Sequence, residues 1–100
     1  MRSDPQTKRL LWFVFAGSRG GLNRLRIIQS IADTPMNTNQ LAEKMGMDYK
    51  GIQHHMRVLV KNNLVTREGE KYGVLYFVSP LLEHNKEALD EIVKKLEKSK

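Results

Sequence analysis

The chain has 100 residues, no cysteine, and 17 lysines and arginines against 11 aspartates and glutamates. This length fits one domain with a modest core, and the lack of cysteine excludes disulfides and thiolate metal sites and fits a reducing cytoplasm. Residues 1–63 hold ten basic and four acidic side chains, whereas residues 64–100 hold seven of each. Because the positive excess lies in the first part, a polyanionic partner is favoured over a generally basic surface.

The first 20 residues are predicted to contain a helix, with Asp4 as its N-cap, Pro5 at its first position and its end at Gly17. The apolar run 10–16 is too short for a signal peptide or a membrane span. A strand is the competing interpretation, since tryptophan, phenylalanine and valine favour sheets. The run is apolar on nearly all sides, so we expect a partner subunit to cover it, with burial in the chain's own core as the alternative. The expected contact residues are Leu11, Trp12 and Phe15.

A second helix is predicted over residues 22–32, and Asp33-Thr34-Pro35 would end it. Its apolar stripe consists of Leu25, Ile27, Ile28, Ile31 and Ala32. Arg24 and Arg26 are expected to reach phosphates or solvent. Met36 is expected to form a one-residue strand contact.

The middle of the chain has the pattern of a helix-turn-helix. Asn37 with Gln40 three residues later predicts the start of the first helix, and Gly46 predicts its end in a left-handed turn. Asp48 predicts the cap of the second helix, which would run from Tyr49 to about Asn62. Two short helices joined in this way place the second one in a DNA major groove.

This second helix has an apolar side, formed by Ile52, Met56 and Leu59, and a polar side, formed by Lys50, Gln53, His54, Arg57 and Lys61. The amide and the imidazole can read base edges, and the cations can hold phosphates. His55 follows His54 directly, so the two rings point about 100° apart and cannot share a metal ion. We interpret His55 as a hydrogen-bonded residue at the boundary of the core.

A β-hairpin is predicted next, with strands over residues 64–67 and 72–78 and a turn over residues 68–71. Arg67 and Lys71 flank its tip, where such a hairpin meets DNA, although two glutamates in the turn oppose that contact. The residues expected to contact DNA are Asn37, Thr38, Asn39, Tyr49, Lys50, Gln53, His54, Arg57, Lys61, Arg67 and Lys71.

Ser79 and Pro80 predict the start of a last helix that would continue to about Lys98. Its apolar residues alternate in steps of three and four, which is typical of a helix–helix seam. The seam consists of Leu82, Asn85, Leu89, Ile92 and Leu96. We expect it to contact a second copy of the chain, with docking on the chain's own domain as the alternative.

The runs NRLRIIQSIAD and NQLAEKMGMDYKGIQHHMRVLVKNNLV, followed by a hairpin ending in YFVS, resemble ArsR-type winged helix-turn-helix regulators over roughly residues 21–79. The segment HHMRVLVKNNLV is close to the family's H-L-x-x-L-x-x-x-G-L-V pattern, with Asn63 where glycine is usual. The resemblance implies a mainly α fold with a small β-hairpin, as one domain. Its parts would be an N-terminal helix in residues 1–20, a winged-helix core in 21–79 and a C-terminal helix in 80–100. The family's Cys-Val-Cys metal ligands are missing.

These features predict a homodimeric transcriptional regulator that binds double-stranded DNA, with no cofactor, no metal and no membrane contact, and with no effector assigned. An enzyme is not expected, because the sequence has no nucleophile elbow, phosphate-cradling loop or H-E-x-x-H motif. Two other hypotheses stay open: an architectural DNA-binding protein with low sequence specificity, and a winged helix that binds other proteins.

Overall fold

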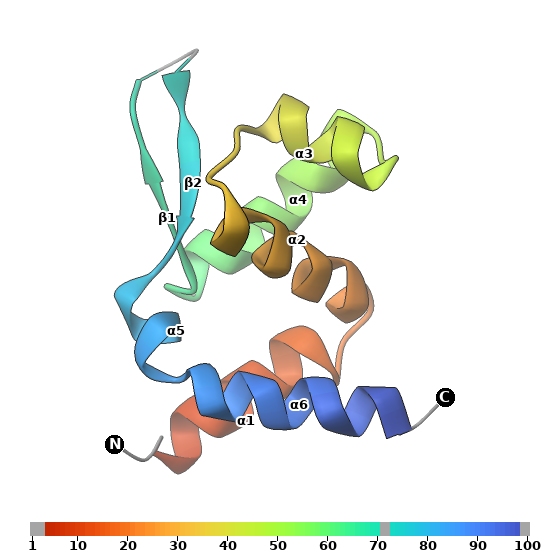
Figure 1. Cartoon of the computed structure of the whole chain (residues 1–100), viewed down its shortest axis with the longest axis vertical. Coiled ribbons are helices and arrows are strands. Elements are labelled where there is room, and N and C mark those ends of the chain that lie inside the picture. Colours follow the sequence, from red (N-terminus) through yellow and green to blue (C-terminus); the bar gives the residue numbers. More distant parts are fainter. Residues whose placement is uncertain (1–3, 71–72, 99–100) are drawn as a thin grey trace.

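The computed structural model describes residues 4–70 and 73–98, and these form a group of helices with a small two-stranded sheet at one edge (Figure 1). The elements are α1 (Pro5–Phe15), α2 (Gly21–Asp33), α3 (Thr38–Met45), α4 (Tyr49–Lys61), β1 (Val65–Glu68), β2 (Leu75–Val78), α5 (Pro80–His84) and α6 (Lys86–Lys98). The predicted mainly α fold with one hairpin is confirmed. No helix in the described ranges is long and apolar enough to cross a membrane.

The N-terminal segment is a helix, as predicted, and not a strand. Asp4 caps it by accepting a hydrogen bond from the backbone N–H of Thr7 at 2.8 Å, and Pro5 occupies the first position. The turn into α2 is tight, because a Cβ at Gly21 would lie 2.5 Å from the carbonyl oxygen of Phe15. The apolar stripe of α2 is buried at Leu25, Ile27, Ile28 and Ile31, whereas Ala32 is exposed, contrary to the prediction.

The helix-turn-helix forms as its capping residues predicted. The side chain of Asn37 accepts from the backbone N–H of Gln40 at 2.8 Å, and Gln40 accepts in return from the backbone N–H of Asn37 at 2.9 Å. Gly46 ends α3 with φ at 65°, which a residue without a Cβ adopts at little cost. Asp48 caps α4 through the backbone N–H of Gly51, and the helix ends at Lys61 with Asn62 as its C-cap.

The hairpin pairs β1 and β2 in antiparallel register, with Val65 opposite Val78. The predicted contact of Met36 is confirmed, because its carbonyl oxygen accepts from the backbone N–H of Tyr76 at 2.9 Å. The first strand lies one residue later than predicted, and the return strand starts only at Leu75. Lys71 and Tyr72, predicted for the turn and the return strand, lie outside the described residues.

The prediction of one continuous helix after Pro80 is wrong, because Asn85 separates α5 from α6. The backbone N–H of Asn85 donates to the carbonyl oxygen of Leu82 at 3.0 Å, and its side-chain amide donates to that of Leu81 at 2.7 Å. Asn85 therefore ends α5, while its own carbonyl accepts from the N–H of Leu89 at 3.2 Å as α6 begins. The expected three–four seam is thus divided between two helices.

The molecule has two distinct ends along its longest axis (Figure 1). The end of β1, the start of β2 and α3 lie at one end, and α1 and α6 lie at the other. Helix α1 contacts both α2 and α6, and α4 contacts α3 and β1. One continuous set of buried side chains runs from Leu11 in α1 to Ile92 in α6, so the two ends share a core.

Candidate nucleic-acid interface

Two adjoining hollows lie between α4, the start of α3 and the hairpin. The first has a volume of about 200 Å³ and is lined by Asn37, Thr38, Asn39, Tyr49, Gln53, Arg67, Val74 and Tyr76. The second has a volume of about 510 Å³ and is lined by Gln53, Met56, Arg57, Val60, Lys61, Arg67 and Tyr76. Because Gln53, Arg67 and Tyr76 line both, the hollows form one concave strip. The strip brings together residues from three separate segments that the sequence analysis had assigned to DNA contact.

The two sides of α4 are as predicted. Ile52, Met56 and Leu59 are buried in the core. The opposite side is exposed and consists of Lys50, Gln53, His54, Arg57 and Lys61. Three cations, an amide and an imidazole on one exposed helix face can make both phosphate and base contacts.

The residues at the start of α3 differ in how much of each side chain is free to contact a ligand. Asn39 is exposed, but Thr38 is only 8% exposed and offers little of its side chain to a ligand. The side-chain oxygen of Asn37 is already used in the helix cap, so its amide nitrogen is the group left for an outside contact. Tyr49 is 46% exposed, and Arg67 is exposed on β1.

Arg24 is buried, which corrects the expectation that it reaches phosphates or solvent. Its Nε donates to the carbonyl oxygen of Val14 at 3.1 Å, and its Nη2 donates to Ser18 Oγ at 2.6 Å and to the carbonyl oxygen of Arg19 at 3.2 Å. Its Nη1 lies 3.3 Å from Nδ1 of His55 in α4. The hydrogen-bonded position predicted for His55 is confirmed.

The sequence contained a signal for the burial of Arg24. This residue lies three positions before Ile27 and four before Ile28, so it shares their face of α2. Burial lowers the pKa of the Arg24 guanidinium. Burial, the charge of Arg24 and the neighbouring His54 together lower the pKa of His55 below its ordinary value of 6.5.

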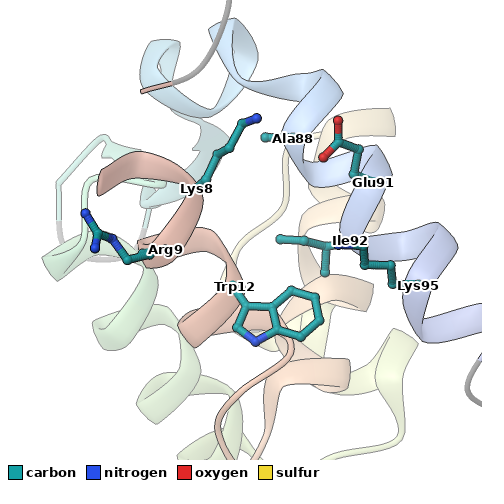
Figure 2. Close-up of a pocket in the computed structure, with 7 residues that line it drawn as sticks. All are labelled: Lys8, Arg9, Trp12, Ala88, Glu91, Ile92 and Lys95. Carbon is teal, nitrogen blue, oxygen red and sulfur yellow. The ribbon is translucent and has the colours of Figure 1, made fainter. Parts of the chain in front are cut away.

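The opposite end of the molecule carries a groove of about 260 Å³ between α1 and α6 (Figure 2). It is lined by Lys8, Arg9, Trp12, Ala88, Glu91, Ile92 and Lys95. Trp12 is 45% exposed, and Nζ of Lys95 lies 5.6 Å from the centre of its ring. Figure 2 shows the indole lying between the two helices beside Lys95.

Most of the residues predicted for a subunit interface are buried within the single chain. Six of the eight are buried in the chain's own core, because α1, α5 and α6 supply that core: Leu11, Phe15, Leu82, Asn85, Leu89 and Ile92. Leu96 is half-buried, and Trp12 is the member with substantial exposure. Phe13 and Leu22, which the sequence analysis did not select, are 61% and 58% exposed. The large apolar side chains that stay exposed on α1 and at the start of α2 are therefore Trp12, Phe13 and Leu22.

Residues 14–75 match the family described as the N-terminal domain of the methanogenesis regulatory protein FilR1. The chain belongs to this family. The match covers more than half of the chain and includes α2, the helix-turn-helix and β1. The chain is thus a winged helix-turn-helix transcriptional regulator, as predicted. No curated protein sequence matches it.

Solved structures show the same fold. A possible ArsR-family transcriptional regulator from Mycobacterium bovis, a homodimeric winged helix-turn-helix DNA-binding domain, has a TM-score of 0.66 and 19% identity, covering 95% of this chain and 89% of that one. Reduced HlyU from Vibrio cholerae has a TM-score of 0.63 and 18% identity, and the match covers 87% of this chain and 83% of HlyU. A MarR family protein from Bacillus stearothermophilus has a TM-score of 0.61 and 16% identity, and the match covers 94% of this chain and 64% of that protein. The narrower ArsR-type resemblance stays a prediction.

Proposed function

We propose that the chain binds specific double-stranded DNA sequences as a homodimer, with α4 in the major groove and the β1–β2 hairpin as a wing. The observation that carries this proposal is the concave strip, in which exposed side chains of α4 meet the start of α3 and Arg67 of the hairpin. A duplex is a convex, anionic surface with readable base edges, and the strip offers the complementary shape and chemistry.

The exposed residues of α4 divide into two roles. Gln53 can pair with the two hydrogen-bonding groups of an adenine edge, and His54 can donate to a guanine acceptor. Lys50, Arg57 and Lys61 are point contacts for phosphates, which fix the position of the helix on the duplex without reading sequence. Arg67 extends this contact to the hairpin. Lys71, also proposed for the wing, lies outside the described residues.

A dimer is supported by exposed apolar side chains on α1 and at the start of α2. Trp12, Phe13 and Leu22 lie on α1 and at the start of α2, so they could be covered by a second copy while both strips stay free. The Mycobacterium bovis domain of the same fold is homodimeric. A two-fold dimer presents two reading helices about 34–36 Å apart, which one duplex face can accept.

Selection of bound sequences from a random duplex pool tests the proposal. We expect an inverted repeat whose half-sites are one helical turn apart. Affinity for the selected duplex should fall by roughly 10³–10⁵ between 50 and 200 mM salt if the dimer makes about six to ten phosphate contacts. No enrichment over the starting pool, or an affinity that does not depend on salt, would contradict the proposal.

A further inference from the structure

Arg24 connects three parts of the molecule through one buried side chain. It starts from α2, and its hydrogen bonds reach Val14 at the end of α1, Ser18 and Arg19 in the following turn, and His55 in α4. The contact with His55 spans 31 positions in the sequence and is the one that reaches the DNA-reading helix. This guanidinium therefore links α2, the end of α1 and the following turn to α4 by hydrogen bonds.

The chemistry of the pair determines the protonation state of His55. A guanidinium can only donate hydrogen bonds, so Nδ1 of His55 must accept from Arg24. An accepting Nδ1 carries no proton, and the ring is then neutral with its proton on Nε2. Protonation at Nδ1 would place an N–H against an N–H and a cation against a cation.

The ring of His55 has little space in which to escape such a contact. Gly20 lies against it with φ at 85°, and a Cβ at that position would be 2.7 Å from Cε1 of His55. His55 is 7% exposed. The ring therefore cannot move towards Gly20 unless the 17–20 turn moves as well, and on the other side it is attached to α4, so its displacement from Arg24 acts on one of these two segments. On α4 the next side chain towards the DNA face is His54, whose ring centre is 5.7 Å away.

We propose that Arg24 is a positioning residue for α4, and that protonation of His55 breaks their hydrogen bond and releases DNA in acid. This inference rests on the proposed function, because it concerns the regulation of the same strip. Arg24 itself does not touch DNA. It holds the helix that carries Gln53 and His54 in the orientation that the hairpin and α3 complement.

The charges around His55 determine the direction of the pH effect. The charged or titratable neighbours that act on it are Arg24 from α2 and His54 from its own helix, and both lower its pKa, as does burial. The end of α1 and the following turn contribute the carbonyl oxygens of Val14 and Arg19 and the hydroxyl of Ser18, all of which engage Arg24.

The pKa of His55 is lowered from its ordinary value of 6.5. The stabilisation that the neutral ring provides is therefore fully present above pH 6.5, and it is lost as the pH falls through the lowered pKa. Acid therefore favours states in which the ring has left Arg24.

The first experiment compares the pH dependence of DNA affinity in the wild type and in His55→Asn, on the selected duplex at constant ionic strength. Asparagine keeps an acceptor near the position of Nδ1 but does not titrate. We expect the DNA affinity of the wild type to be constant above pH 6.5 and to decrease as the pH falls below 6.5. Each chain in the complex takes up one proton, so the decrease is at most about tenfold per pH unit for each chain bound to the duplex. His55→Asn should lack this fall. Parallel profiles would overturn the proposal. His84→Asn, which changes an exposed histidine of α5, is the matched control and should keep the wild-type profile.

A second variant tests Arg24 itself. Arg24→Gln retains a donor for neutral His55, removes the positive charge that lowers its pKa, and adds an amide oxygen that can accept from a protonated Nδ1. If protonation of His55 acts by opposing Arg24, the acid loss of affinity should be much smaller in this variant than in the wild type. A lower affinity at every pH with an unchanged acid loss would reduce Arg24 to a purely structural role and overturn the proposal.

A third measurement does not depend on DNA. Nitrogen-15 NMR of the histidine rings in the wild-type chain should show His55 neutral at pH 7 with its proton on Nε2, titrating below 6.5. A proton on Nδ1 at neutral pH would overturn the inference, whether or not the chain binds DNA. Failure of the proposed function would instead appear as no DNA affinity at pH 8, with the NMR result intact.

Discussion

Phe13 and Leu11 offer a direct test of which apolar side chains serve the core and which serve a second copy of the chain. They are two residues apart on α1, yet Leu11 is fully buried and Phe13 is 61% exposed within one chain. Phe13→Ser removes apolar surface that faces outward, whereas Leu11→Ala leaves a cavity inside the chain. The two variants should therefore affect different equilibria.

The burial of each side chain sets the expected magnitudes. Full burial of a phenylalanine contributes about 1.5–3 kcal/mol, and 61% of Phe13 is still available, so dimerisation gains about 1–2 kcal/mol from each chain. Phe13→Ser should then weaken a two-fold dimer by about 2–4 kcal/mol, which raises the dissociation constant roughly thirty- to a thousandfold. The stability of the single chain should change by less than about 0.5 kcal/mol. Leu11→Ala should lower it by about 2–5 kcal/mol.

Sedimentation equilibrium at micromolar concentration measures association, and urea unfolding measures stability. The wild type should have about twice the single-chain mass of 11.6 kDa, and Phe13→Ser should shift towards that mass while its unfolding midpoint at low concentration stays close to wild type. A wild-type mass of 11.6 kDa, or a dissociation constant that Phe13→Ser leaves unchanged, would refute the argument.

Further variants test the strip and the turns that support it. Gln53→Ala should lose about 1–3 kcal/mol on the selected duplex and relax one base position in a repeated selection, whereas Lys61→Ala should weaken all sequences alike and lower the salt slope by about one. Asn37→Ala removes the capping oxygen of α3 and should cost about 1 kcal/mol in urea unfolding; an unchanged midpoint would mean that the cap contributes nothing. Asn63 has φ at 58°, so Asn63→Gly should be at least as stable as wild type and Asn63→Ala less stable by about 1 kcal/mol. Equal stability of these two variants would show that the turn relaxes to another conformation.

The starts of α1, α3, α4 and α5 could be predicted from the sequence because their signals are local. Asp4, Asn37, Asp48 and Ser79 each accept a hydrogen bond from a backbone N–H three residues later, so the partners are fixed by chain distance alone. The two faces of α4 follow from helical periodicity in the same way. These signals were sufficient to locate the helix-turn-helix and the exposed residues proposed for DNA contact.

The tertiary structure decided which of two equally apolar neighbours is buried. Nothing within α1 distinguishes Leu11 from Trp12 or Phe13, and the difference arises because α2 and α6 cover one side of the helix. The break at Asn85 divides the expected seam, and most of its residues are buried in the chain's own core. Arg24 and His55 are a stronger case. The spacing of Arg24 from Ile27 and Ile28 indicated its burial, but nothing in either segment indicated that the two side chains contact each other. Their contact exists only because folding brings together positions 31 residues apart, which no local periodicity encodes.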